Sequence, residues 1–180
     1  MTIQQSRVNG KVFFVILAMM MLSALVISPS VAQDSPEELP QQPILPLSMA
    51  MQAAQVALET CADNGYQVSV AIVERNGMDK VLLRNDGAGP HTINSSRQKA
   101  FTSASMGRPT GDIANAIAGN PAIEGLRDMD DRLLFLEGGL PIVANGQVIA
   151  GIGVGGAPGG NLDAECAQAG IDSLGFGDSE

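Results

Sequence analysis

The stretch QVSVAIVERNGMDKVLLR, residues 67–84, decides the fold of this chain. Its first half, residues 67–75, is β-branched and almost continuously apolar, which is typical of a buried strand. Asn76-Gly77 follows, a pair strongly favoured in tight hairpin turns, and residues 80–84 supply an apolar return strand. Because a tight hairpin makes its two strands antiparallel, this stretch predicts an antiparallel sheet.

A second hairpin with the same turn signal lies nearer the C-terminus. Residues 139–144 and 147–154 are apolar and flank Asn145-Gly146. The short apolar segment RLLFL, residues 132–136, precedes this hairpin and is expected to be one more strand. The two hairpins and this segment together predict five strands.

Four segments with apolar residues at helical spacing surround these strands. They are residues 47–64, 93–106, 110–118 and 161–174. Asn161 is a suitable N-cap for the last of them, with acidic residues in its first turn. The order of elements is therefore α-β-β-α-α-β-β-β-α. It predicts an α+β domain in which helices pack on a five-stranded antiparallel sheet.

The first 32 residues have the layout of a secretory signal peptide. A short polar start is followed by the apolar run 12–27, by Pro29 and by a Ser-Val-Ala cleavage signature that ends at Ala32. We expect cleavage after Ala32 and no stable membrane insertion afterwards. An uncleaved signal anchor is the alternative, but the apolar run is shorter than the roughly 20 residues that a membrane span needs.

The remainder of the chain divides by composition. Residues 33–46 carry four prolines among acids and glutamines and are expected to be an extended tether. Residues 47–175 are expected to form the folded domain, and residues 176–180 an acidic tail.

The charge of the chain restricts its partners. Its formal net charge is −9 at pH 7, and it contains no tryptophan. Acidic surfaces repel nucleic acid phosphates and anionic lipid head groups, so neither is expected as a partner. The scarcity of aromatic residues disfavours stacking platforms for sugars or bases, and it also counts against a conventional haem pocket.

The two cysteines, Cys61 and Cys166, are expected to form a disulfide. A pair of cysteines in an exported chain favours that bond. Each lies on an apolar stripe of a predicted helix, and both helices are expected to face the same sheet. Two buried free thiols, or a metal or redox role, are the alternatives.

Glycines near the C-terminus form two patterns. Gly151, Gly153 and Gly156 match the spacing G-x-G-x-x-G, but the first two lie inside a predicted strand and one helix follows, so a dinucleotide site is not expected. Glycines inside a strand suggest instead the close approach of a ligand or another subunit. The loop 155–160 precedes a helix, and it is either an anion nest or a structural turn.

His91 is the single histidine, and it lies in a Gly/Pro-rich loop before a helix that contains Arg97 and Lys99. It is therefore the one imidazole that could bind haem iron or another metal. A histidine that makes only local hydrogen bonds is the alternative. The hydroxyls that follow in this helix lack the spacing of a serine hydrolase, so that chemistry is not expected, and these residues alone name no activity.

The chain also resembles the GlcG/HbpS-like family. The resemblance rests on VSVAIVERNG at residues 68–77, on DGAG and SSRQKAFTSASMGRPT within residues 86–110, and on GGLPIVANGQVIAGIGVGGAPGGNLDAECAQAGI at residues 138–171. It implies an α+β fold with a central antiparallel sheet and assembly into dimers or larger homo-oligomers. It also implies haem or corrinoid binding in some members.

Carried over residue by residue, the resemblance implies a pocket rim made of Lys99 and the glycines of the 155–160 loop. These glycines are Gly155, Gly156, Gly159 and Gly160. The assignment of His91 as the candidate iron ligand comes from its own chemistry and not from a family motif.

Two function hypotheses follow. The first is an exported protein, periplasmic or secreted, that binds haem or a related tetrapyrrole. The second is an enzyme or enzyme accessory acting on a small anionic metabolite held by Arg97, Lys99 and the glycine loop. A homo-oligomer is expected in either case, because the apolar, glycine-bearing strand 147–154 belongs to a small sheet that must protect its edges and faces.

Overall fold

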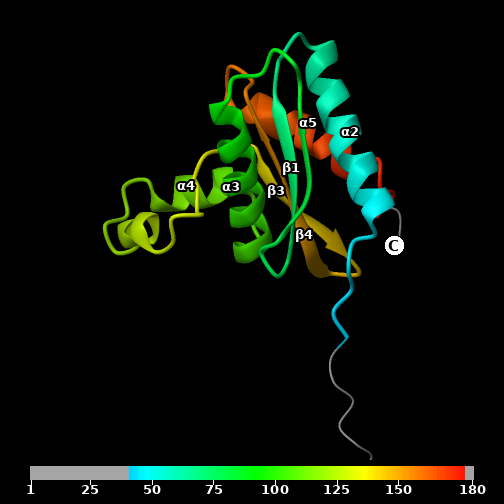
Figure 1. Ribbon diagram of the computed structural model, residues 1–180. Helices are drawn as coiled ribbons and strands as arrows, with labels where there is room; N and C mark the ends of the chain where they lie inside the picture. The colour runs from blue at the N-terminus through cyan, green and yellow to red at the C-terminus, as the bar shows by residue number, and fades with distance from the viewer. Residues whose placement is uncertain (1–40, 177–180) are drawn as a thin grey trace, which may run out of the picture. The chain divides into compact units, whose positions relative to one another are not determined.

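The computed structural model describes residues 41–176 (Figure 1). The signal-peptide prediction, most of the tether and the last four residues lie outside this range. Within it no helix is long and apolar enough to cross a membrane. In chain order the elements are α2 (Leu47–Asp63), β1 (Ser69–Glu74), β2 (Asp79–Arg84), α3 (His91–Met106), α4 (Thr110–Ile117), the 3₁₀ helix η1 (Glu124–Asp128), β3 (Gly139–Ala144), β4 (Gln147–Gly155) and α5 (Gly160–Asp172).

The four strands form one antiparallel sheet in the order β2-β1-β4-β3. The α+β class is therefore confirmed, and both predicted hairpins are present. Asn145 and Gly146 have positive φ values of 50° and 73°, as a two-residue turn with the twist of its strands requires. The β1–β2 turn is wider, with a register shift after Ile72, and of its residues only Gly77 has a positive φ.

The prediction of a fifth strand at residues 132–136 was wrong. Residues 132–136 run without strand pairing, and Leu133 and Phe135 are buried in a small separate cluster with Ile113 and Ile117 of α4. The backbone N–H of Leu134 donates to the Thr102 hydroxyl of α3 at 2.9 Å. The alternating apolar side chains of this segment are therefore buried against helices α3 and α4 and not in a sheet. Either environment can bury such side chains, so the alternation alone does not identify a strand.

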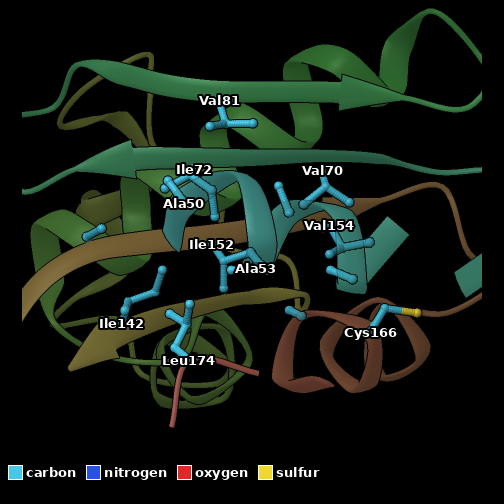
Figure 2. Close-up of a cluster of buried hydrophobic side chains, with 14 of the residues drawn as sticks. Ala50, Ala53, Val70, Ile72, Val81, Ile142, Ile152, Val154, Cys166 and Leu174 are labelled. Carbon is cyan, nitrogen blue, oxygen red and sulfur yellow. The ribbon is translucent and has the colours of Figure 1, made fainter. Parts of the chain in front are cut away.

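Helices cover both faces of the sheet. Helices α2 and α5 share a core with the apolar side chains of one face, and α3 packs on the other, as Figures 1 and 2 show. Small α2 residues such as Ala50 and Ala53 let this helix approach Ile72 and Ile152 of the central strands closely. Leu45 is also fully buried in this core, so the domain begins inside the segment expected to be a tether.

A disulfide joins Cys61 of α2 to Cys166 of α5, with the two Cα atoms 5.6 Å apart. Both cysteines lie in the core shared by these helices, so the expected bond is present between helices on the same sheet face. The two backbones also meet at Gly170, where a Cβ atom would collide with the carbonyl oxygen of Ala53.

The glycines of β4 lie against α3, with no side chain between the two backbones. A Cβ atom at Gly151 would collide with the carbonyl oxygen of Ala100, and one at Gly153 would collide with the carbonyl oxygen of Ser96. We call this contact of β4 with α3 the glycine seam. The close approach predicted for these glycines is therefore made by the chain's own helix, and neither a ligand nor a second subunit occupies it. The glycine-bearing strand therefore gives no argument for oligomerisation, because β4 is a central strand covered by α3, and within the sheet only the edge strands β2 and β3 still support it.

We expect Gly153→Ala to destabilise the domain by about 3 kcal/mol or more, because the added methyl meets backbone atoms that cannot rotate away. Gly125→Ala is the matched control, since a Cβ atom at Gly125 has no neighbour within 4 Å. Urea unfolding of both variants checks this. If the two variants were equally stable, the close backbone contact at Gly153 would be contradicted.

Candidate functional site

An open groove of about 470 Å³ runs along the outer face of α3. Three segments line it: the β1–β2 turn, the middle of α3, and the segment after η1. The lining residues are Gly77, Met78, Asp79, Asn94, Arg97, Gln98, Phe101, Asp131 and Arg132. We call this the α3 groove.

Helical periodicity explains the contribution of α3. Asn94, Arg97, Gln98 and Phe101 follow the spacing i, i+3, i+4 and i+7, which places them on one face of the helix. The opposite face, which includes Ala100, packs on the glycine seam. One helix therefore holds the sheet with one side and forms the groove with the other.

Arg97 is paired across the groove with Asp79 of β2. Its Nε atom donates to Asp79 Oδ2 at 2.8 Å, and its Nη2 atom donates to the same oxygen. This hydrogen bonding raises the pKa of Arg97 above its usual value. The two side chains remain 45% and 40% exposed, so water competes for both partners.

Arg132 lies on the opposite wall, with its guanidinium carbon 4.2 Å from the centre of the Phe101 ring. Its Nε and Nη2 atoms donate to the two carboxylate oxygens of Asp130 at 3.0 and 2.7 Å. These bonds lower the pKa of Asp130 to about 2. The guanidinium is thus fixed by an aromatic ring and by a two-oxygen contact.

His91 was expected in the loop before this helix, but it is the first residue of α3, where it is exposed to solvent. It does not line the α3 groove, but it precedes Asn94 by three residues and so lies on the same helix face, one turn towards the N-terminus. The imidazole packs against Gly89, where a Cβ atom would be 2.6 Å from its Cε1 atom.

Lys99 and the glycine loop meet each other, but away from the groove. The Lys99 ammonium is buried, and it donates to Asp163 Oδ2 at 2.7 Å and to the carbonyl of Val154 at 2.9 Å. The other Asp163 oxygen accepts the backbone N–H of Ala157 at 3.0 Å. The Asp163 carboxylate therefore occupies the position that an anionic ligand was expected to take: it pairs with Lys99 and accepts the N–H group of Ala157 in the glycine loop.

Asp163 is buried with its partner. Burial raises the pKa of the Asp163 carboxyl, and the attraction of Lys99 together with the Ala157 hydrogen bond opposes that rise. The sequence showed Asp163 only as an acid in the first turn of a helix. Its pairing with a lysine 64 residues away could not be inferred from spacing.

The remaining loop glycines are used in packing. Gly156 has a φ of 131°, and a Cβ atom there would lie 2.6 Å from the carbonyl oxygen of Gln67. Gly160 lies against Glu137, and Gly155 against Ser95 of α3. Of the predicted site residues, only Arg97 lines the α3 groove, and Met78, Phe101 and Arg132 were missed. The sequence could have indicated Met78 by its position next to the Asn76-Gly77 turn and Phe101 by its position on the face of α3 that carries Arg97.

Among residues 41–176 no three His, Cys, Asp or Glu side chains are grouped to hold a bare metal ion. The polar groups that line the groove are the thioether of Met78, the guanidinium groups of Arg97 and Arg132, two carboxylates and two side-chain amides, and the imidazole of His91 lies one turn away.

Taken together, the four-stranded sheet, the helices on both of its faces and the groove along α3 define a small α+β domain built around one central antiparallel sheet. The chain belongs to the family described as haem degrading protein HbpS-like, whose model matches residues 45–172. The resemblance noted in the sequence is confirmed.

Several relatives support the assignment. A double mutant of HbpS from Streptomyces reticuli is 43% identical with a TM-score of 0.71, and the match covers 81% of this chain and 95% of that one. Protein ORFY of Klebsiella pneumoniae is 27% identical with a TM-score of 0.73, over 81% and 100% of the two chains. Protein GlcG of Escherichia coli is 31% identical over 110 residues, which are 60% of this chain and 80% of GlcG.

Proposed function

We propose that this protein binds haem or a related tetrapyrrole, such as a corrinoid, in the α3 groove. The observation that carries the proposal is the composition of this groove, in a chain of the HbpS-like family. A protein with the same fold, PduOC, has been crystallised as a haem complex; it is 22% identical with a TM-score of 0.69, over 77% of this chain and 100% of that one.

The chemistry of the groove suits such a ligand. A tetrapyrrole combines a flat apolar macrocycle with carboxylate or amide side chains at its edge. Met78 offers an apolar surface that is 65% exposed, and Phe101 lies beside it. The lining also contains the guanidinium groups of Arg97 and Arg132, each paired with an aspartate. Apolar contact and a few directed polar groups are what small-molecule sites generally combine.

Two side chains are candidates to ligate the iron of a bound haem. Imidazole and thioether are both common ligands of haem iron. His91 stands at the N-terminal end of the α3 groove face, and Met78 stands on the β1–β2 turn. Bound haem would supply a redox-active iron, while the residues of the groove would hold and orient the macrocycle.

Titration of the purified protein with haemin tests the proposal. We expect a saturable shift of the Soret band, weakened or abolished in His91→Ala if the imidazole is the ligand. Met78→Leu removes the thioether and keeps its bulk, so it tests the second ligand in the same way. A wild-type protein that leaves the haemin spectrum unchanged would reject haem as the ligand.

The alternative, a small anionic metabolite, now rests on Arg97 alone. Lys99 is paired and buried, and the glycine loop is occupied by packing contacts. Thermal stabilisation by a small carboxylate, with no Soret shift, would favour this alternative and reopen the question of an enzyme.

Export and self-association also remain part of the proposal. The signal-like segment at residues 1–32 supports a periplasmic or secreted location, and the Cys61–Cys166 disulfide is typical of an oxidising compartment. A homo-oligomer is supported by the family resemblance and by the two sheet edges, β2 and β3. An edge strand presents unpaired backbone groups that need cover.

A further inference from the structure

We propose that Arg97 is the residue that receives a carboxylate of the bound tetrapyrrole, and that Asp79 holds its place in the free protein. The inference rests on the proposed function and names the chemistry of the same site. It follows from the different ways in which the two groove arginines are paired.

The contact of Arg97 with Asp79 is incomplete. Both donating nitrogens, Nε and Nη2, point to a single oxygen, Asp79 Oδ2. Within residues 41–176 the second oxygen of Asp79 and the Nη1 atom of Arg97 take part in no side-chain hydrogen bond. A guanidinium binds a carboxylate best through two parallel bonds to two oxygens, so this pair leaves part of its bonding capacity unused.

The surroundings make this pair easy to replace. Both side chains are close to half exposed, and exposed ion pairs contribute little to stability because water and salt compete with them. A ligand carboxylate that took two bonds from Arg97 would therefore gain more than the loss of Asp79 costs. The carboxylate of Asp79 would then turn to solvent.

The side chain of Arg132 is more exposed than that of Arg97, at 62% against 45%, so the two arginines differ in their pairing and not in their exposure. Arg132 already contacts both oxygens of Asp130, its own backbone N–H also donates to Asp130 at 2.8 Å, and its guanidinium covers Phe101. Removing Asp130 from it would break three hydrogen bonds. We therefore assign Arg132 a structural role and assign Arg97 the binding of the ligand carboxylate.

The ligand class follows from the neighbours of Arg97. Arg97 lines the same groove as Met78 and Phe101, so a single ligand that contacts all three would combine a flat apolar body with a carboxylate at its rim. The propionate side chains of haem have this arrangement. A corrinoid, whose edge groups are mainly amides, would use Arg97 less.

The test compares Arg97→Gln with Asp79→Asn in haemin titrations, using the full chain after signal removal. We expect Arg97→Gln to weaken binding about tenfold, the loss of one charge-assisted contact. Asp79→Asn should tighten binding instead, because it frees the guanidinium. Haemin dimethyl ester, which lacks both carboxylates, should bind the two variants and the wild type equally.

Arg108→Gln is the matched control, since Arg108 is exposed and does not line the α3 groove. If both variants weaken haemin binding, the pair is structural and the proposal is wrong. If neither variant changes haemin binding, Arg97 does not bind the ligand carboxylate, although the protein would still be a haem-binding protein. If the wild type binds no haemin, the proposed function fails and this inference with it.

Discussion

Replacing Cys61 and Cys166 together by alanine is expected to lower the free energy of unfolding by about 4–5 kcal/mol. The bond closes a loop between residues 105 apart, and a cross-link over so long a loop removes much of the conformational freedom of the unfolded chain. Chemical denaturation of the wild-type and double-alanine proteins measures the difference.

Reduction provides the control for this prediction. A reductant should destabilise the wild-type protein to about the level of the double variant and leave the double variant unchanged. Haemin binding by the folded double variant should be retained, because the disulfide lies with α2 and α5 on the sheet face opposite α3. Equal stability of oxidised and reduced wild-type protein would contradict the prediction.

Lys99→Met is expected to cost about 3–5 kcal/mol at neutral pH, because it leaves the buried carboxylate of Asp163 without its cation. The double variant Lys99→Met with Asp163→Asn should recover much of this loss. Asparagine keeps an oxygen for the backbone N–H of Ala157 and carries no charge. Urea unfolding of the single and double variants completes the cycle.

The cost of Lys99→Met should also depend on pH. Burial raises the pKa of Asp163, and the substitution removes the lysine whose attraction opposes that rise. In the variant the folded-state pKa is then well above the unfolded value, so the folded protein binds a proton more tightly than the unfolded chain. Its deficit should shrink as pH falls through the raised pKa, and a pH-independent deficit would contradict this mechanism.

The hairpins and helices were predictable because their signals are local. The turn at Asn145-Gly146 depends on two neighbouring residues, and helix α3 on a pattern of side chains a turn apart. In segment 132–136 the local pattern predicted burial correctly but predicted the wrong secondary structure. Its alternation correctly predicted that Leu133 and Phe135 are buried, but periodicity does not say whether a sheet or a pair of helices buries them.

The candidate site was less predictable because its contacts join distant parts of the chain. Arg97 was singled out, but its partner Asp79 lies 18 residues earlier on a different element. Lys99 is two residues further along α3, and a rotation of about 200° around the helix axis turns it from the groove to the interior. Sequence proximity therefore grouped two cations that the helix separates.

The glycine seam has a consequence for how specificity could be altered. At Gly151 and Gly153 the backbone of α3 lies directly against β4, so we expect the wall that α3 gives the groove to move little when a ligand binds. Adjustment to a ligand is left to the β1–β2 turn and to the segment around Arg132. The exposed outer position Asn94 is expected to tolerate exchange without loss of the fold, whereas the side chain of Gln98 donates to the carbonyl of Asp131 at 2.8 Å. We expect changes of ligand preference to be easier at the outer position Asn94 than at the inner positions of α3, which lie against the glycines of β4.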